Sequence, residues 1–240
     1  MPIDPSLITG FRKRIGESGC EFILGVTVQA GMATKTVAKA SLAVVNVDTT
    51  VQDKAVAFPT DARLLHKARV ALVRHAKKLG INLRQSYERV GLVSFVRSQR
   101  YAHARQINRA KAQNRKLRTY LGRVIRDIER KTQNDHTRTE RLDKLLEIAT
   151  RIHSQPRKRS EGDPPKLYSV HAQQVECIAK GKVHKQYEFG VKVGIVSISK
   201  ESFVIGAKSL PGNPYDGHTL QACIEQAERK RPTNTILARD

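Results

Sequence analysis

The sequence contains no tryptophan, and phenylalanine and tyrosine bring its aromatic content to only 5%. Proteins that bind single-stranded nucleic acid commonly stack successive bases on aromatic rings, and this chain has few of them. Cysteine is also rare: the three cysteines are far apart and form no Cys-X-X-Cys motif. Their odd number and spacing argue against a zinc site or a disulfide framework and indicate a reducing compartment.

Long hydrophobic runs are absent, since no stretch of about 18 apolar residues occurs, and the N-terminus lacks the basic-then-apolar pattern of a signal peptide. Acidic residues are scarce as well: 22 Asp and Glu stand against 44 Lys and Arg, which gives a formal net charge of +22 over 240 residues. So basic a chain attracts polyanions, mainly through the release of counterions from phosphates. We expect a cytoplasmic protein associated with nucleic acid, and no membrane partner.

The first part of the chain predicts helix followed by strand. Apolar residues recur at helical spacing from Leu7 to Gly16 and again as far as Gly31, which predicts a pair of helices. Residues 44–51 are rich in β-branched side chains and predict a central strand that carries Asp48. A carboxylate is rarely buried in a strand without a partner. Asp48 is therefore either a structurally satisfied residue at a strand end or a metal ligand.

The middle of the chain predicts helices with a basic exterior. Pro59-Thr60-Asp61 is a helix start, and Gly80 ends that helix. Residues 97–131 fit a helix with one apolar seam from Ile107 to Ile128, followed by an antiparallel partner helix over 142–152.

The basic side chains of this region have two interpretations, a solvated face or a contact with the backbone of double-stranded DNA. Mixed charge would be usual on a solvated face, and here the charge has almost one sign, which favours DNA. A hairpin tip near residue 182 adds a second basic cluster, for which both interpretations remain open. The predicted DNA-binding residues are Arg97, Arg100, Arg105, Arg109, Lys111, Arg115, Lys116, Arg118, Arg123, Lys182 and Lys185.

After a polar linker over 157–165, the periodicity changes from helix to strand. The sequence predicts strands, then a helix from about residue 216, then a last β-prone run that ends in Asp240; the predicted strands are 166–170, 187–195, 202–207 and 235–240. Strands separated by helices predict a mixed α/β sheet. Asp48 and Asp240 on neighbouring strands could share Mg²⁺, which prefers carboxylate oxygen. Asp216 is the alternative second ligand, although an N-cap role already explains it.

Several short motifs, in this order, resemble bacterial insertion-sequence transposases of the DDE class, in the insertion sequence five family. They are spread over most of the chain. The motifs that carry the resemblance are Val47-Asp48-Thr49-Thr50-Val51, Pro59-Thr60-Asp61-Ala62-Arg63-Leu64, Leu83-Arg84-Gln85-Ser86-Tyr87, Tyr101-Ala102-His103-Ala104, Val175-Glu176-Cys177-Ile178-Ala179-Lys180-Gly181-Lys182, Tyr187-Glu188-Phe189-Gly190-Val191-Lys192-Val193 and Pro211-Gly212-Asn213-Pro214-Tyr215-Asp216-Gly217-His218-Thr219-Leu220.

The resemblance implies a ribonuclease H-like fold in which an Asp, Asp, Glu triad holds two Mg²⁺ ions. Such enzymes cleave phosphodiesters at insertion-sequence ends and transfer the strand to target DNA. By motif, Asp48 matches the first Asp and Asp240 the second, while the region of the Glu is not found. The expected organisation is a helical remnant over 1–40, a partial core formed by 41–62 and 164–240, and a basic helical insertion over 63–163.

The motifs do not include the N-terminal DNA-binding domain or the Glu region of the family. The expectation is therefore a truncated and inactive bacterial protein that is associated with the nucleoid. The alternative is a non-catalytic DNA-binding protein or transposition inhibitor, acting as a homo-oligomer or paired with full-length transposase. A third class, an RNA-binding protein, is allowed by the charge and opposed by the motifs.

Overall fold

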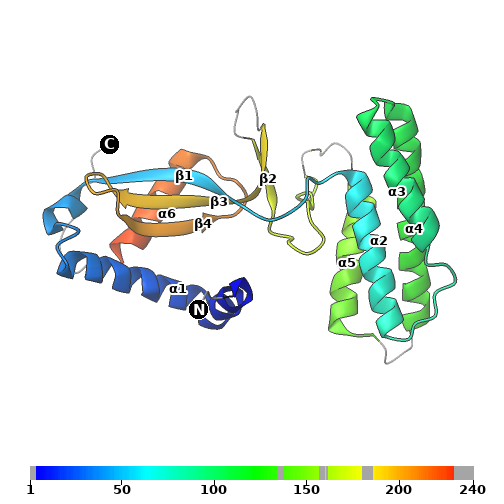
Figure 1. Ribbon diagram of the computed structural model, residues 1–240, viewed down its shortest axis with the longest axis horizontal. Helices are drawn as coiled ribbons and strands as arrows, with labels where there is room; N and C mark the ends of the chain where they lie inside the picture. The colour runs from blue at the N-terminus through cyan, green and yellow to red at the C-terminus, as the bar shows by residue number, and fades with distance from the viewer. Residues whose placement is uncertain (1–3, 134–137, 157–159, 161, 180–185, 230–240) are drawn as a thin grey trace. The chain divides into compact units, whose positions relative to one another are not determined.

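The computed structural model describes residues 4–133, 138–156, 160, 162–179 and 186–229. The chain is mixed α/β, with helices and an antiparallel sheet (Figure 1). It forms two compact units, which are described separately. Residues 1–53 with 178–240 make up the sheet unit, and residues 54–177 make up the helical unit. The helical unit thus begins before residue 63 and ends after residue 163, the limits expected from sequence.

The sheet unit begins with a long helix, which strands and a further helix follow. Its elements are α1 (Pro5–Ala33), the short 3₁₀ helix η1 (Lys39–Ala43), β1 (Val45–Asp53), β3 (Tyr187–Ile198), β4 (Val204–Leu210) and α6 (Asp216–Glu228), and β2 (Glu176–Ala179) begins in the helical unit and ends in the sheet unit. The strands predicted over 44–51, 187–195 and 202–207 and the helix predicted from 216 are confirmed as β1, β3, β4 and α6. The run 235–240 lies outside the described residues.

β3 organises the sheet, because it pairs antiparallel with β1 on one side and with β4 on the other. Asp48 lies opposite Ile195, and Thr49 lies opposite Gly194. Among the described strands β1 pairs with β3 alone and occupies an edge. The predicted central position of β1 therefore depends on residues beyond those described.

One face of this sheet is buried. Side chains alternate between the faces of a strand, and every second residue of β3 from Gly190 to Ile198 is buried. A Cβ at Gly194 would come within 2.4 Å of Cys223 Sγ, so the glycine allows α6 to approach β3 closely. The core on this face consists of Val28, Val37, Leu42, Val196, Ile198, Ile205, Leu210, Cys223 and Ala227. In Figure 1 the strands lie in front of α6, and no described helix covers the face toward the viewer.

Helix α1 follows the predicted start and interruption. Asp4 is its N-cap and accepts a hydrogen bond from the backbone N–H of Ser6 at 2.7 Å. At Gly16 the backbone leaves the helical region, with φ of 64°, and this kinks the helix. The two predicted helices are thus one kinked element. None of the described helices combines the length and apolarity needed to cross a membrane.

The helical unit consists of four helices: α2 (Asp61–Lys78), α3 (Glu88–His103), α4 (Ile107–Thr132) and α5 (Glu140–Ser154). Local signals set the limits of α2. Thr60 is its N-cap and accepts from the N–H of Arg63 at 3.3 Å, and Gly80 follows its end with a positive φ of 71°. Leu72, Leu121 and Leu142 are fully buried where α2, α4 and α5 meet. The predicted partner helix over 142–152 is confirmed as α5.

The prediction of one helix over 97–131 is wrong. The chain turns at 104–106, with Arg105 at a φ of 56°, so that α3 and α4 pack against each other as a hairpin. The apolar seam is buried from Ala110 to Ile128, as predicted, but Ile107 is 48% exposed at the hairpin end. Periodicity alone indicated a single long helix, whereas the structure has two helices that are stabilised by packing against each other.

The strand predicted over 166–170 is also absent. The segment is extended, yet its hydrogen bonds go to a side chain: the N–H of Leu167 donates to Gln155 Oε1 at 2.9 Å, and Gln155 Nε2 donates to Leu167 O at 3.4 Å. Leu167 is buried and joins the core of the helical unit. An extended, apolar run is therefore held here by one glutamine at the end of α5 and not by a neighbouring strand.

Candidate functional site

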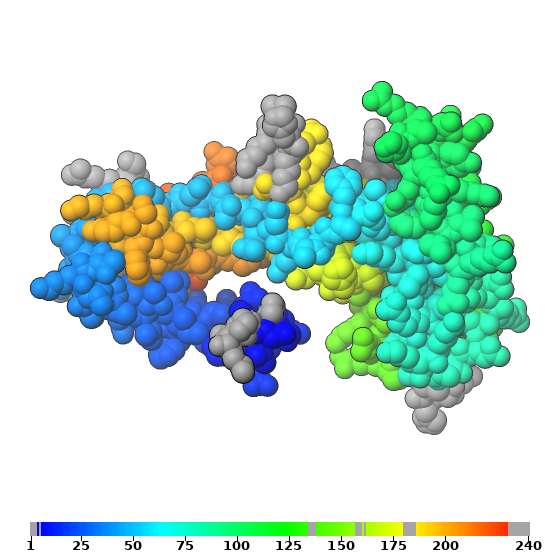
Figure 2. Space-filling view, viewed as in Figure 1, coloured from blue at the N-terminus to red at the C-terminus, as the bar shows by residue number. Residues whose placement is uncertain are grey.

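Asp48 lies on β1 with its side chain exposed, on the sheet face opposite the core. Its Oδ1 accepts a hydrogen bond from the backbone N–H of Thr49 at 2.8 Å. In the space-filling view, the light-blue atoms of β1 lie at the visible surface of the sheet unit (Figure 2). The carboxylate is thus accessible, and its contact with Thr49 leaves lone pairs available for a ligand.

Asp216 has a different role from the N-cap predicted for it. Tyr215 occupies the cap position, and Asp216 is the first residue of α6. Its Oδ1 lies 2.5 Å from Lys192 Nζ and accepts from Thr49 Oγ1 at 3.0 Å. Lys192 is 9% exposed and also donates to Pro214 O at 2.6 Å. The carboxylate therefore ties the start of α6 to β1 and β3, and it neutralises a buried lysine.

The described residues do not supply the donor set of a magnesium site. Asp216 contacts Thr49, whose side chain points to the face of β1 opposite Asp48. Within the described ranges no three His, Cys, Asp or Glu side chains gather as metal ligands. Asp240, the predicted second ligand, lies outside those ranges. Asp48 is left as a single exposed carboxylate, and one such oxygen donor does not hold Mg²⁺ tightly.

The predicted DNA-binding residues gather on the α3–α4 hairpin. Arg118 differs from the others, because it is half-buried and its Nη2 donates to the carbonyl of Gln155 at 3.2 Å. Lys182 and Lys185 are not among the described residues. The remaining eight are exposed and define the basic face: Arg97, Arg100, Arg105, Arg109, Lys111, Arg115, Lys116 and Arg123. Figure 2 shows parts of α2 and α3, in cyan and green, on the visible face of the helical unit.

The turn between α3 and α4 is hollowed and basic. A cavity of about 500 Å³ is bordered by residues 105–109. Arg109 donates to Gln106 Oε1 at 3.0 Å, and its guanidinium lies 5.9 Å from the centroid of the Tyr101 ring. These contacts orient the guanidinium of Arg109 at the end of the hairpin.

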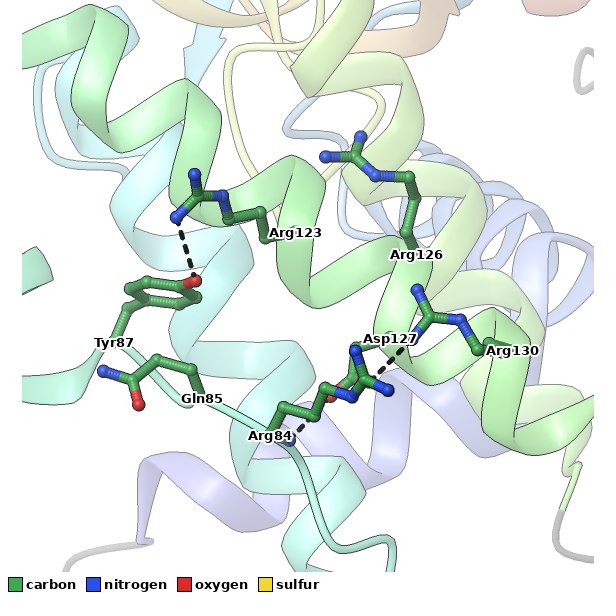
Figure 3. A pocket seen from close by; sticks show the side chains of 7 residues that line it. All are labelled: Arg84, Gln85, Tyr87, Arg123, Arg126, Asp127 and Arg130. Atoms are coloured by element: carbon green, nitrogen blue, oxygen red, sulfur yellow. Dashed lines mark hydrogen bonds and ion pairs between the residues drawn. The ribbon is translucent and has the colours of Figure 1, made fainter.

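A second cationic site is not among those predicted from the sequence. It is a pocket of about 270 Å³ between α4 and the segment that precedes α3, and we call it the arginine pocket (Figure 3). Arg126 and Arg130 lie in the basic stretch 97–131 and were expected only on the exterior of its helix, so they were not among the predicted site residues. The spacing of three arginines at i, i+3 and i+7 on α4 was the available signal, since such positions share one face. The pocket is lined by Arg84, Gln85, Tyr87, Arg123, Arg126, Asp127 and Arg130.

Two titratable groups of α2 lie against α3, one of them buried and the other half-buried. Arg69 is 2% exposed, and its Nη1 donates to Ser86 O at 2.9 Å, which anchors the segment before α3. The His66 ring stacks on Phe95 with centroids 4.6 Å apart. Burial, together with the nearby Arg69 cation, lowers the pKa of His66 to about 4. His66 is therefore neutral at physiological pH and has a packing role.

Comparison with known proteins adds one relative. No known protein family matches the chain, and no solved structure is significantly similar to it. Over 105 residues the chain is 58% identical to a Rhizobium meliloti protein named "Uncharacterized protein ORF8 in nfe locus". The match covers 44% of this chain and 51% of that protein, so the chain spans about half the length of the curated relative it matches. The name of this relative states no activity.

Proposed function

We propose that the helical unit binds duplex DNA through the basic face of the α3–α4 hairpin. The observation that carries this proposal is the exposure of eight Lys and Arg side chains on one hairpin, whose helix α4 buries its apolar seam in the core. Cations held on a rigid helical pair can contact successive backbone phosphates and release their counterions. Such contacts position a protein on DNA and do not read its sequence.

Double-stranded DNA is the preferred partner on chemical grounds. Binding of single strands relies on base stacking, and this chain has 5% aromatic residues and no tryptophan. Its exposed cations lie on the α3–α4 hairpin, and the tyrosines near them are already engaged: Tyr87 and Tyr120 stack on each other with centroids 4.7 Å apart, and the Tyr101 ring lies 5.9 Å from the Arg109 guanidinium. Duplex RNA remains the outcome against which the proposal is tested.

We further propose that the chain is related to DDE transposases of the insertion sequence five family, with a ribonuclease H-like sheet. Support comes from the ordered motifs, from the antiparallel β1–β3–β4 arrangement with α6 on one face, and from Asp48 on the uncovered face. In that class the first strand carries a catalytic Asp. Mg²⁺ would be the cofactor of intact relatives, and insertion-sequence ends would be their substrate.

A non-catalytic role is favoured for this chain by one observation. Asp216, the alternative second ligand, is engaged by Lys192 at 2.5 Å and by Thr49 at 3.0 Å. A DNA-binding chain without an assembled acidic site would occupy DNA without cutting it. It would thereby act as a transposition inhibitor, alone or paired with a full-length transposase.

Fluorescence anisotropy with duplex DNA, duplex RNA and single strands, over a range of salt concentrations, tests the proposal. The R100Q/K111Q variant removes two cations of the basic face. We expect it to reduce the slope of log affinity against log salt by roughly 0.9 for each phosphate that the variant no longer neutralises. R74Q/R141Q removes two exposed cations elsewhere in the helical unit and is the matched control. Equal slopes for R100Q/K111Q and the wild type, or a preference for RNA, would refute the proposed DNA interface.

A further inference from the structure

The arginine pocket is built from α4 and the segment before α3. Arg123, Arg126 and Arg130 project from one face of α4, while the backbone N–H of Arg84 donates to Asp127 Oδ2 at 2.8 Å. Asp127 is buried, and this hydrogen bond holds the Arg84 segment against the helix. Figure 3 shows Arg84 and Arg130 on either side of Asp127. The pocket is thus positioned by a buried contact and does not depend on flexible side chains alone.

Tyr87 forms the other end of the pocket. It has a left-handed backbone with φ of 53°, a conformation that is costly for a bulky residue. Its ring stacks on Tyr120, and Arg123 Nη1 donates to its hydroxyl oxygen at 3.4 Å. The tyrosine therefore holds the guanidinium of Arg123 at this end of the pocket.

The charges of the pocket are not balanced within it. Four arginines and one carboxylate, that of Asp127, line the pocket. Asp127 forms ion pairs with Arg130 and Lys131, each at 3.7 Å. Within the described parts of the chain, the guanidiniums of Arg84 and Arg126 have no acceptor. Cations gathered at one site repel each other unless an anion lies between them. Guanidinium donates two parallel hydrogen bonds to a phosphate, and arginine is the preferred residue for that ligand.

We propose that the arginine pocket binds a phosphoryl group. A phosphate of the DNA backbone and a free phosphate share this chemistry, and the proposed function of the helical unit favours the DNA source. The pocket, which shares Arg123 with the basic face, then fixes one phosphate of the duplex in addition to those contacted by the other residues of that face. This assignment of the source rests on the proposed DNA binding, whereas binding of phosphate itself is measured without DNA.

The test uses the 240-residue chain and inorganic phosphate, titrated by calorimetry at constant ionic strength maintained with sodium chloride. R84Q/R126Q removes the two guanidiniums that have no described acceptor and keeps Asp127 in place. Because hydrogen bonds to charged groups are strong, we expect this variant to weaken phosphate binding at least about tenfold. R74Q/R141Q, with the same change of charge in the same unit, should bind phosphate as the wild type does. Absence of saturable binding to the wild type, or equal weakening in both variants, would refute the pocket.

DNA binding then separates the two sources. If the pocket holds a backbone phosphate, R84Q/R126Q should lower the salt slope of duplex binding by roughly 0.9, for one phosphate. An unchanged slope together with abolished phosphate binding would overturn the DNA source and assign the pocket to free phosphate. R100Q/K111Q should leave the affinity for inorganic phosphate unchanged, so a failure of the basic face and a failure of the pocket give different results. Circular dichroism of each variant verifies that the helices are retained.

Discussion

At the scale of single residues, burial decides what a polar side chain does. Asp48 and Asp216 are both exposed carboxylates in the sheet unit, yet Asp48 has a backbone contact with Thr49, whereas Asp216 neutralises Lys192, which is buried. Burial also raises the pKa of the Cys223 thiol, so this cysteine is a packing residue rather than a reactive one. In the helical unit His66 is held neutral by the same effect.

His66 predicts a dependence of stability on pH. Its pKa is about 4 in the folded chain, against an ordinary value of 6.5. Between these values the unfolded chain binds more protons, so stability is complete above about pH 6.5 and is lost as the pH falls toward 4. One pKa unit corresponds to about 1.4 kcal/mol, and because His66 is partly exposed we expect a loss of about 1–2 kcal/mol.

The variant H66F retains a ring against Phe95 and removes the titration. Urea unfolding at several pH values should show a smaller fall in stability between pH 6.5 and pH 5 than in the wild type. Some fall should remain, because burial also lowers the pKa of His75 and His153. H103Q, at an exposed position on α3, controls for the removal of a histidine. A slope in H66F equal to that of the wild type would contradict the assignment.

At the scale of elements, a periodic sequence pattern identified the helices but not where they turn. The apolar seam of α4 was expected to run from Ile107 to Ile128, and the structure buries it only from Ala110 onward. Ile107, the first residue of α4 after the turn at 104–106, is 48% exposed. Because the chain turns between His103 and Ile107, the residues of the basic face are divided between α3, the turn and α4.

Leu121 inside the seam and Ile107 at its N-terminal end should therefore respond differently to truncation. Leu121 is 0% exposed, so Leu121→Ala should lower the free energy of unfolding by about 2–5 kcal/mol through reduced burial and the cavity left behind. Ile107 is 48% exposed, so Ile107→Ala should change it by less than about 0.5 kcal/mol. Chemical denaturation measures both. Similar losses for the two variants would indicate a continuous seam and contradict the turn at 104–106.

At the scale of the whole molecule, binding and catalysis have different structural support. The helical unit carries the basic face and the arginine pocket, whereas the described part of the sheet unit offers Asp48 as a single exposed carboxylate. Cleavage of a phosphodiester by two metals requires several carboxylates around them. We therefore propose DNA binding, and not catalysis, as the activity of this chain.

We expect the purified chain to bind supercoiled plasmid and to leave it intact. With Mg²⁺ or Mn²⁺ present, the nicking rate of the wild type should equal that of D48N, because one carboxylate does not assemble a two-metal site. Gel electrophoresis of the plasmid measures nicking, and anisotropy verifies that D48N still binds DNA. Metal-dependent nicking or strand transfer that D48N abolishes would show that an active site forms and would overturn the non-catalytic proposal.

Local signals in the sequence determined much of the framework. The caps at Asp4 and Thr60, the break at Gly16 and the alternation in β3 were predictable, because they depend on neighbouring residues and on the period of burial. The excess of basic residues likewise indicates a polyanionic partner by composition alone. These properties are local or compositional, so the sequence by itself contains them.

Only the tertiary structure decided which distant groups meet. The partnership of Asp216 with Lys192, the capture of Leu167 by Gln155 and the contact of Arg84 with Asp127 each join segments that lie far apart in sequence. Hydrogen-bond partners across such separations depend on how helices and strands pack, and no periodicity encodes them. For that reason the basic face could be predicted from composition. The arginine pocket could not, because it depends on the packing of α4 against the segment before α3.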